Sequence, residues 1–175
     1  MSTLSLNGKM PQTKAAAFVA ENATLVGDVV LEKAASIWYG AVLRADTGRI
    51  FVGEGSNIQD NAVLHTGPEL DVVVGKNVSV GHGAIVHGCT VSDDALIGMH
   101  ATVLNGARIG RGAVVAAGAL VPAKMEVPDG MLAIGIPAKI RGPVSEEMKA
   151  ANLANAENYR QLGAVHAAAQ DAQKG

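Results

Sequence analysis

Aliphatic residues recur every six positions through most of the chain. The first run comprises Val19, Leu25, Leu31, Ile37 and Leu43. The same spacing resumes after short slips in phase and continues to Val127. An amphipathic helix would repeat near 3.6 residues and a half-buried strand at 2, so a period of six indicates neither of them.

A period of six is typical of a triangular parallel β-helix, in which three hexads make one coil of about eighteen residues. Each hexad supplies one short strand and one corner, and its aliphatic residue points inward. The low aromatic content, 3% of residues, agrees with a narrow core filled by Val, Ile, Leu and Ala. An ordinary parallel-sheet protein is the alternative, but its strands would not keep a fixed spacing. We therefore predict an all-β solenoid, a left-handed parallel β-helix with an N-terminal cap, over residues 1–144.

The chain changes character after the repeat ends. Pro128-Asp129-Gly130 is a turn signal, and from Ser145 the composition shifts toward Ala, Glu, Gln, Asn and Lys. Ser145 suits an N-cap, because two glutamates follow it in the first helical turn. We predict a helix from Ser145 to Gln170 within a C-terminal segment of residues 145–175. Its expected packing stripe comprises Met148, Leu153, Ala156, Tyr159 and Leu162.

Charge and composition exclude several classes of partner. The net charge is −2 and no basic run occurs, which argues against nucleic-acid binding. The longest apolar run is far too short to span a membrane. The single cysteine, Cys89, cannot form an intrachain disulfide and favours a reducing compartment. We predict a cytoplasmic protein with neither a nucleic-acid nor a membrane partner.

Two of the five histidines fall into one column of the predicted coil. His65 directly follows Leu64, and His87 directly follows Val86. The 22 residues between the two histidines equal one coil plus a four-residue slip in the loop 66–71. They therefore occupy the same position of the same face, about 4.8 Å apart. Two imidazoles at that spacing can bind one tetrahedral metal ion, for which Zn–N distances are about 2.0–2.1 Å.

His82 lies on another face, above Asp60, which again stands 22 residues earlier. At roughly 3.3 Å per residue, the backbones of His82 and His87 remain roughly 10 Å apart even around a corner. One ion is not easily reached from both places on a single chain. Two chains side by side can reach it, and triangular prisms packed about a three-fold axis form a cyclic trimer with one such site per interface. Stacked corner histidines can also be idle at the surface, and we interpret His100 and His166, outside both columns, in that way.

Other polar residues share these columns. Arg44 falls in the column of His65, and Gln59 lies beside Asp60 on the corner that carries His82. Polar neighbours of this kind orient the ligands of a metal site. The residues therefore predict a metal centre between subunits.

These stretches resemble the signature of the γ-class carbonic anhydrase family. The matching stretches are Arg44-Ala45-Asp46, Asn57-Ile58-Gln59-Asp60 with His65, Val80-Gly81-His82, His87-Gly88-Cys89-Thr90, Leu96-Ile97-Gly98-Met99 and Gly135-Ile136-Pro137-Ala138. The resemblance covers nearly the whole chain, whereas the hexad repeat alone is shared with many acyltransferases. It implies a homotrimer whose metal ligands are His65 and His87 of one subunit and His82 of the next. The implied ion is Zn²⁺, and three imidazoles also suit Fe²⁺ or Co²⁺.

The resemblance also implies roles for the surrounding side chains. Arg44 and Asp46 would form ion pairs between subunits, and Asp60 would pair with the arginine. Gln59 would orient the metal-bound water. Asn57 lies in the matched motif, and Tyr159 resembles a tyrosine that some family members bring to the site from the helix.

The implied activity is that of a lyase, the reversible hydration of carbon dioxide to bicarbonate by a metal-bound hydroxide at the subunit interface. Two departures concern the proton that must then leave. Thr47 stands where the archetype has a glutamate, and the short loop 66–71 offers only Glu69 or Asp71 in place of the usual shuttle. Two alternatives follow: a metal-binding relative with little or no hydratase activity and a structural or partner role, or a hexapeptide-repeat acyltransferase or CoA thioesterase.

Overall fold

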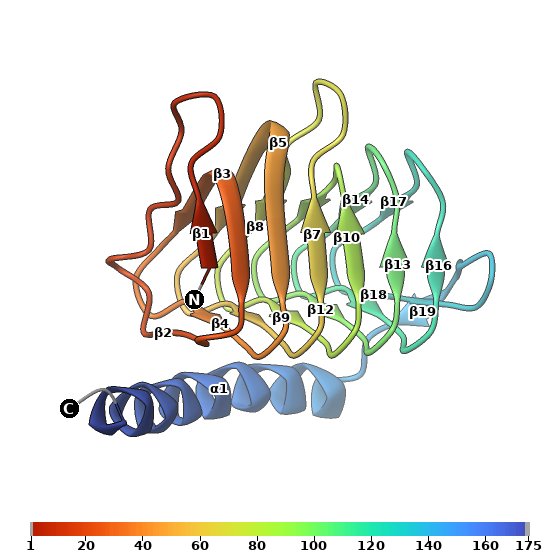
Figure 1. The fold of residues 1–175 in the computed structure, drawn as a ribbon. Coiled ribbons are helices and arrows are strands. Elements are labelled where there is room, and N and C mark those ends of the chain that lie inside the picture. Colours follow the sequence, from red (N-terminus) through yellow and green to blue (C-terminus); the bar gives the residue numbers. More distant parts are fainter. Residues whose placement is uncertain (1, 174–175) are drawn as a thin grey trace.

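Residues 2–173 are described by the computed structural model, and they form a three-sided stack of parallel strands with one long helix alongside (Figure 1). The left-handed parallel β-helix predicted from the period of six is confirmed, together with its C-terminal helix. Parallel pairing relates strands one coil apart, as in Ile58 with Val80 and Leu64 with Val86. No helix among residues 2–173 is long and apolar enough to cross a membrane.

We name the three faces by their place in the molecule. The helix-side face comprises β2 (Phe18–Val19), β4 (Ser36–Ile37), β6 (Asn57–Ile58), β9 (Ser79–Val80), β12 (Leu96–Ile97), β15 (Val114–Val115) and β18 (Met131–Ile134), with β19 (Lys139–Pro143) antiparallel to β18. The histidine face comprises β1 (Ser2–Leu4), the first parts of β3 (Thr24–Leu31) and β5 (Val42–Val52), β7 (Val63–His65), β10 (Ile85–His87), β13 (Thr102–Val103) and β16 (Leu120–Val121). The third face comprises the second parts of β3 and β5, β8 (Val72–Val74), β11 (Thr90–Val91), β14 (Arg108–Ile109) and β17 (Glu126–Val127).

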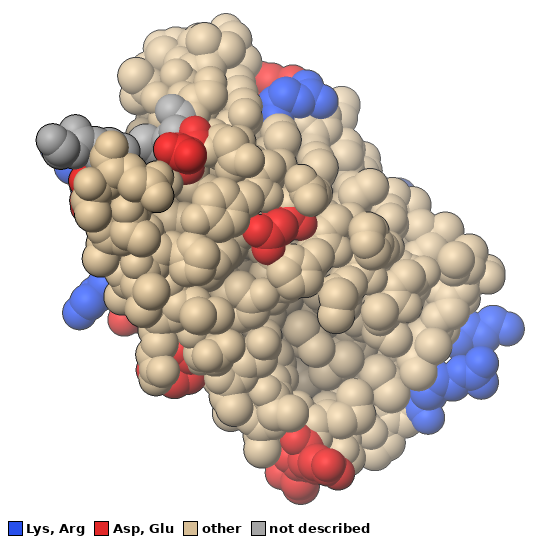
Figure 2. Space-filling view, turned by 60° about the horizontal axis from the view of Figure 1, so that its bottom comes forward, with Lys and Arg blue, Asp and Glu red and all other residues tan. Residues whose placement is uncertain are grey.

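The helix α1 (Glu146–Ala172) lies along the helix-side face, where charged side chains are sparse and lie mainly toward the margins (Figure 2). It begins as predicted, because the Ser145 side chain accepts a hydrogen bond from the Met148 amide at 3.2 Å. The predicted packing stripe is only partly right. The buried helix residues are Asn152, Ala156 and Gly163, whereas Met148, Leu153 and Leu162 are exposed by 36–48%.

The surface beneath the helix explains this difference. The outward residues of β4, β6 and β9 are Ser36, Asn57 and Ser79, so the helix meets small and polar side chains there. A close approach to such a surface favours small or hydrogen-bonding helix residues over bulky apolar ones. Of the exposed apolar residues, Met148 lies beside Leu96 and Val114, farther along the face than these small and polar residues.

His166 is not idle at the surface, as its place on a polar helix led us to expect. Its Nδ1 lies 2.8 Å from the Tyr39 hydroxyl, and its ring centroid is 5.0 Å from that of Trp38 and 5.7 Å from that of Phe18. Phe18 and Trp38 are buried. This aromatic cluster therefore docks the C-terminal half of α1 onto the first coils.

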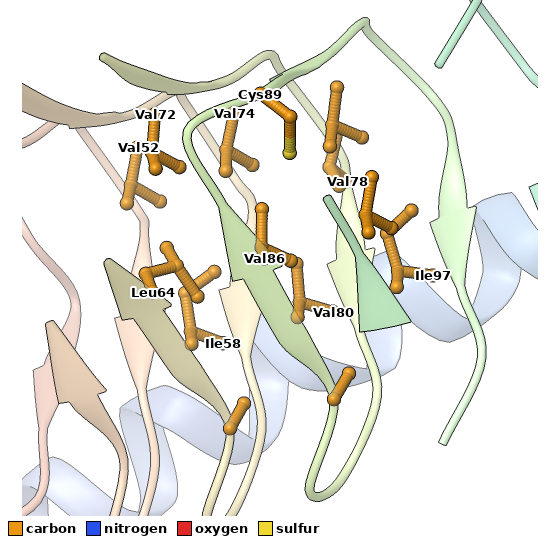
Figure 3. Packing of buried hydrophobic residues seen from close by; sticks show 14 of the residues in the cluster. Val52, Ile58, Leu64, Val72, Val74, Val78, Val80, Val86, Cys89 and Ile97 are labelled. Atoms are coloured by element: carbon orange, nitrogen blue, oxygen red, sulfur yellow. The ribbon is translucent and has the colours of Figure 1, made fainter. Parts of the chain in front are cut away.

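The interior is filled by the aliphatic residue of each hexad (Figure 3). Pairs from successive coils, such as Val52 with Val74, meet in register and are fully buried. Burial of apolar surface at about 25 cal/mol per Å² is the main favourable term for such a core. Because each coil repeats the same backbone path, residues one coil apart are stacked, and this stacking positions the polar columns described next.

Candidate metal centre

One half of the candidate site lies on the histidine face, at the ends of β7 and β10. His65 and His87 are paired in register, and Arg44 of β5 is paired with His65 one coil earlier. His65 Nδ1 lies 2.9 Å from His87 Nε2, and the ring centroids are 4.8 Å apart. The structure thus places these three side chains in the column that the spacing predicted.

Polar neighbours hold both imidazoles in this half. His65 Nε2 lies 2.9 Å from Asp46 Oδ1, and the other Asp46 oxygen pairs with Arg44 of the same chain. Burial alone would raise the pKa of Asp46, but hydrogen bonds from His65 and the backbone, with the charge of Arg44, hold it below its usual value. His87 Nδ1 lies 2.5 Å from Asn105 Oδ1.

Asn105 is a contact that sequence reasoning missed. It follows His87 by 18 residues, whereas the coil at this point is 17 residues long, since Val86 pairs with Val103. The one-residue deletion therefore places Asn105 one position beyond the residue in register with His87, and the repeat alone does not point to it. Asn105 accepts from His87 Nδ1 only when that nitrogen carries the proton, which leaves Nε2 with its lone pair.

The other half of the candidate site lies at the corner after β9. His82 Nδ1 lies 2.8 Å from Asp60 Oδ2, one coil earlier, and Nε2 lies 3.3 Å from the Tyr159 hydroxyl of α1. The His82 side chain is 41% exposed. Burial raises the pKa of the Tyr159 hydroxyl, and the nearby Asp60 charge raises it further.

Gln59 and Asn57 adjoin His82 on the helix-side face, and both are buried. Gln59 Nε2 donates a hydrogen bond to Asn57 Oδ1 at 3.0 Å. No partner for Gln59 Oε1 occurs among residues 2–173, so this oxygen can accept a hydrogen bond from a molecule in the adjoining groove.

A groove of about 480 Å³ opens beside His82, between α1 and the helix-side face. Figure 2 shows it as a hollow bordered by uncharged atoms. Its polar lining residues are Gln59, His82, Asn155 and Tyr159. Its apolar walls include Leu96, Met99, Val114, Ile134 and Met148.

The loop after His65 is short and tightly closed. An antiparallel bridge joins Gly67 and Leu70, and the Thr47 hydroxyl lies 3.1 Å from that of Thr66 and 3.0 Å from the Gly67 carbonyl oxygen. Asp71 Oδ1 accepts a hydrogen bond from the Arg49 amide at 2.7 Å. Of the two acids considered for proton transfer, Asp71 therefore fastens the loop, whereas Glu69 stands exposed at its tip.

These side chains fit a metal site whose ligands come from two neighbouring chains. Within one chain, residues 2–173 contain no group of three His, Cys, Asp or Glu side chains that could hold an ion. The facing nitrogens of His65 and His87 are 2.9 Å apart, close to the roughly 3.3 Å between two nitrogen ligands of a tetrahedral Zn²⁺. One chain thus offers two converging imidazoles, with His82 on a separate corner.

Hexad strands and stacked histidines define a class of hexapeptide-repeat proteins, and comparison with known proteins agrees. The family pattern "Bacterial transferase hexapeptide (six repeats)" matches residues 88–123. A hexapeptide transferase family protein from Anaplasma phagocytophilum superimposes with a TM-score of 0.88 at 43% identity, covering 93% of this chain and 96% of that one.

Two curated relatives narrow the class. The probable carbonic anhydrase of Methanocaldococcus jannaschii is 41% identical over 82% of this chain and 91% of its own. Mitochondrial γ carbonic anhydrase 2 of Arabidopsis thaliana is 43% identical over 91% of this chain. The chain spans 59% of the length of that plant relative. The protein belongs to the γ-class carbonic anhydrase-like family of hexapeptide-repeat proteins.

Proposed function

We propose that the protein is a metal-dependent carbonic anhydrase that acts as a homotrimer in the cytoplasm. The observation that carries this proposal is where the three histidines lie. Two are stacked on one face, and the third lies on a different corner of the same chain. His65 and His87 of one subunit and His82 of the next would hold Zn²⁺, with Fe²⁺ or Co²⁺ as alternatives. A bound Zn²⁺ with three imidazole ligands lowers the pKa of a water molecule at its open position to about 7.

The chain's own residues orient the reactants. Asn105 and Asp60 keep His87 and His82 in one tautomer, and Asp46 does the same for His65. Gln59 Oε1 accepts a hydrogen bond from the attacking water and turns its lone pair toward carbon dioxide. Carbon dioxide has no net charge, so the apolar groove beside His82 suits its approach.

Arg44 completes the wall of the site through its ion pair with Asp46. The ion pairs between subunits implied for Arg44, Asp46 and Asp60 remain part of this proposal, because the pairs described above lie within one chain. The reaction converts carbon dioxide and water into bicarbonate and one proton. Glu69, exposed at the loop tip after His65, and Tyr159, beside His82, are the groups that can carry this proton outward.

Subunit complementation tests the division of the ligands. His82→Ala and His87→Ala chains, carrying different tags, are expressed singly and together, and trimers are isolated by mass and by both tags. Each variant alone should bind no metal and should show no carbon dioxide hydration in stopped-flow measurements. In trimers that carry both tags, co-expression should restore about a third of the sites, because each mixed trimer pairs one intact His82 with one intact His65–His87 pair.

Two results would count against the proposal. If co-expression restores neither metal nor activity while mixed trimers form, the ligands are not shared between chains. If metal returns without hydration, the site serves as a staple between subunits or a platform for a partner, and the protein is not a hydratase.

The groove favours one further candidate function. At about 480 Å³ it far exceeds the size of carbon dioxide, and its walls are apolar. We propose, as the second candidate, hydrolysis of an acyl ester or thioester whose apolar group fills the groove. A rise in kcat/KM from acetyl to butyryl p-nitrophenyl esters, removed by Met99→Glu, would support it; a fall with chain length would exclude it.

A further inference from the structure

The outward side chains of the helix-side face change character along the stack. The column begins with the apolar Phe18 and continues with the polar Ser36, Asn57 and Ser79, all of which are buried. Beyond Ser79 it continues with Leu96 and Val114. The polar part of the column therefore coincides with the coils that carry Gln59 and His82.

Buried polar groups cost free energy unless they are hydrogen-bonded, so this polar segment needs partners. Ser36 Oγ accepts a hydrogen bond from Trp38 Nε1 at 3.0 Å. Asn57 Nδ2 donates to Ser79 Oγ at 3.0 Å. The Asn57–Ser79 pair thus forms a separate unit, and Gln59 joins it through Asn57 Oδ1.

The last member of this unit comes from the helix. Asn155 Nδ2 donates to Ser79 Oγ at 3.0 Å, so the serine oxygen accepts from two amides, one in the solenoid and one in α1. Asn155 is held in place by its neighbours, because Ala156 is buried and Asn152 Nδ2 donates to the Asp94 carbonyl oxygen at 2.6 Å. A continuous chain of hydrogen bonds therefore runs from α1 to Gln59.

We propose that Asn155 and Ser79 are positioning residues that fix the orientation of the Gln59 side-chain amide. Because Ser79 Oγ accepts from both asparagine amides, both of its lone pairs are used, Asn57 presents its Oδ1 to Gln59, and Gln59 presents its Nε2 in return. Gln59 lines the groove, and with its Nε2 bonded to Asn57 its carbonyl oxygen is the group left to accept a hydrogen bond from the attacking water. If the amides could rotate, a donor would face the groove for part of the time and that hydrogen bond would be lost. The catalytic part of this inference rests on the proposed function, whereas the orientation of Gln59 does not.

The test compares Asn155→Leu with Asn158→Leu in the full-length, zinc-loaded protein. Leucine fills the same space as asparagine without its hydrogen bonds. Asn158 is a matched control, since it is exposed on the next turn of α1. The first measurement is hydrogen exchange of the Gln59 side-chain amide by NMR, assigned with Gln59→Glu. Asn155→Leu should speed this exchange by about tenfold, and Asn158→Leu should leave it unchanged.

The second measurement is a double-mutant cycle on carbon dioxide hydration. Asn155→Leu should lower kcat by about five- to tenfold with little change in KM, and it should have no further effect in a Gln59→Ala background. Ser79→Ala should reproduce both results, and it serves in place of Asn155→Leu if that variant fails to fold. Unchanged amide exchange in a folded variant would overturn the inference, and so would additive losses in the cycle. If the protein proves not to hydrate carbon dioxide, the exchange experiment still decides the orientation of Gln59.

Discussion

The two halves of the candidate site are built in different ways. The histidine-face half, comprising His65, His87, Asp46 and Asn105, is assembled entirely from successive coils of the solenoid. The helix-side half combines residues of the coils with one side chain from α1. It comprises His82, Asp60, Gln59 and Asn57 from the coils and Tyr159 from the helix. The first half depends on strand register alone, whereas the second also depends on how the C-terminal helix docks.

The two halves should differ in how well they keep their structure when the protein is mutated. Register in a solenoid is determined by the buried aliphatic residues of every coil, so it persists unless the core itself is damaged. A docked helix can loosen locally while the solenoid stays folded. Changes to α1 should therefore affect His82 and Gln59 and leave the His65–His87 pair intact.

Metal removal should have the largest effect and should disable both halves together. Dialysis against a chelator such as dipicolinate is expected to lower carbon dioxide hydration by at least about 10³-fold, because no other group here makes water a nucleophile near neutral pH. The far-UV circular dichroism should keep its β-sheet signal, since the coils are held by a continuous hydrophobic core that contains none of the proposed metal ligands. Loss of that signal would mean that the coils themselves require the metal.

Asn105→Ala should weaken the histidine-face half specifically. Without its acceptor, the His87 imidazole is free to change tautomer and orientation, and such changes typically cost about 10- to 100-fold in metal affinity. The affinity can be measured by competition with a fluorescent zinc chelator. Asn22→Ala is a suitable control, because its side chain accepts a hydrogen bond from the Gly40 amide and is not part of the histidine-face half. Equal affinities for wild type and Asn105→Ala would show that His87 needs no second partner.

The sequence predicts the histidine-face half better than the helix-side half, because strand register follows from the repeat and helix docking does not. The spacing of Leu64 and Val86 predicted the stacking of His65 on His87, and the observed register agrees. Asn105 escaped notice because the shortened coil places it one position beyond the residue in register with His87. The stacking of His65 on His87 is local to the repeat, so periodicity is enough to find it.

The helix-side half could not be obtained from periodicity. Tyr159 was reached only through a family resemblance, since nothing in the hexads says where α1 docks. The helix stripe was mispredicted because bulky apolar residues were expected to face the solenoid, whereas the surface beneath presents Ser36, Asn57 and Ser79. His166 was missed because its partner Tyr39 lies 127 residues earlier in the chain.

His166→Ala should loosen the helix-side half with a smaller effect. The change removes a hydrogen bond to Tyr39 and ring contacts with Trp38, so the free energy of unfolding should fall by about 2 kcal/mol. Urea unfolding followed by Trp38 fluorescence measures this directly. Val165→Ala, 64% exposed on the same turn, should change stability by less than about 0.5 kcal/mol. If both variants behave alike, the aromatic cluster does not anchor α1.

Asp28→Asn should have the smallest effect, because it lies outside both halves. Asp28 Oδ2 pairs with Lys9 at 3.1 Å and with Arg49 at 3.2 Å, and both cations are more than half exposed. Burial alone would raise the pKa of Asp28, but the hydrogen bonds and charges of these two cations hold it below its usual value. A carboxyl with a lowered pKa stabilises the folded state at pH values above the unfolded-state pKa of about 3.9, and this contribution disappears as the pH falls through the folded-state pKa.

The asparagine variant should therefore be less stable than wild type by about 0.5 kcal/mol at pH 7, a value limited by solvent screening of the exposed cations. The difference should shrink to nothing near pH 2 and should also diminish in about 1 M salt. Urea unfolding at the two pH values measures it, with metal content as a control that should not change. A difference that widened toward low pH would have the wrong sign for a carboxylate held ionised by Lys9 and Arg49.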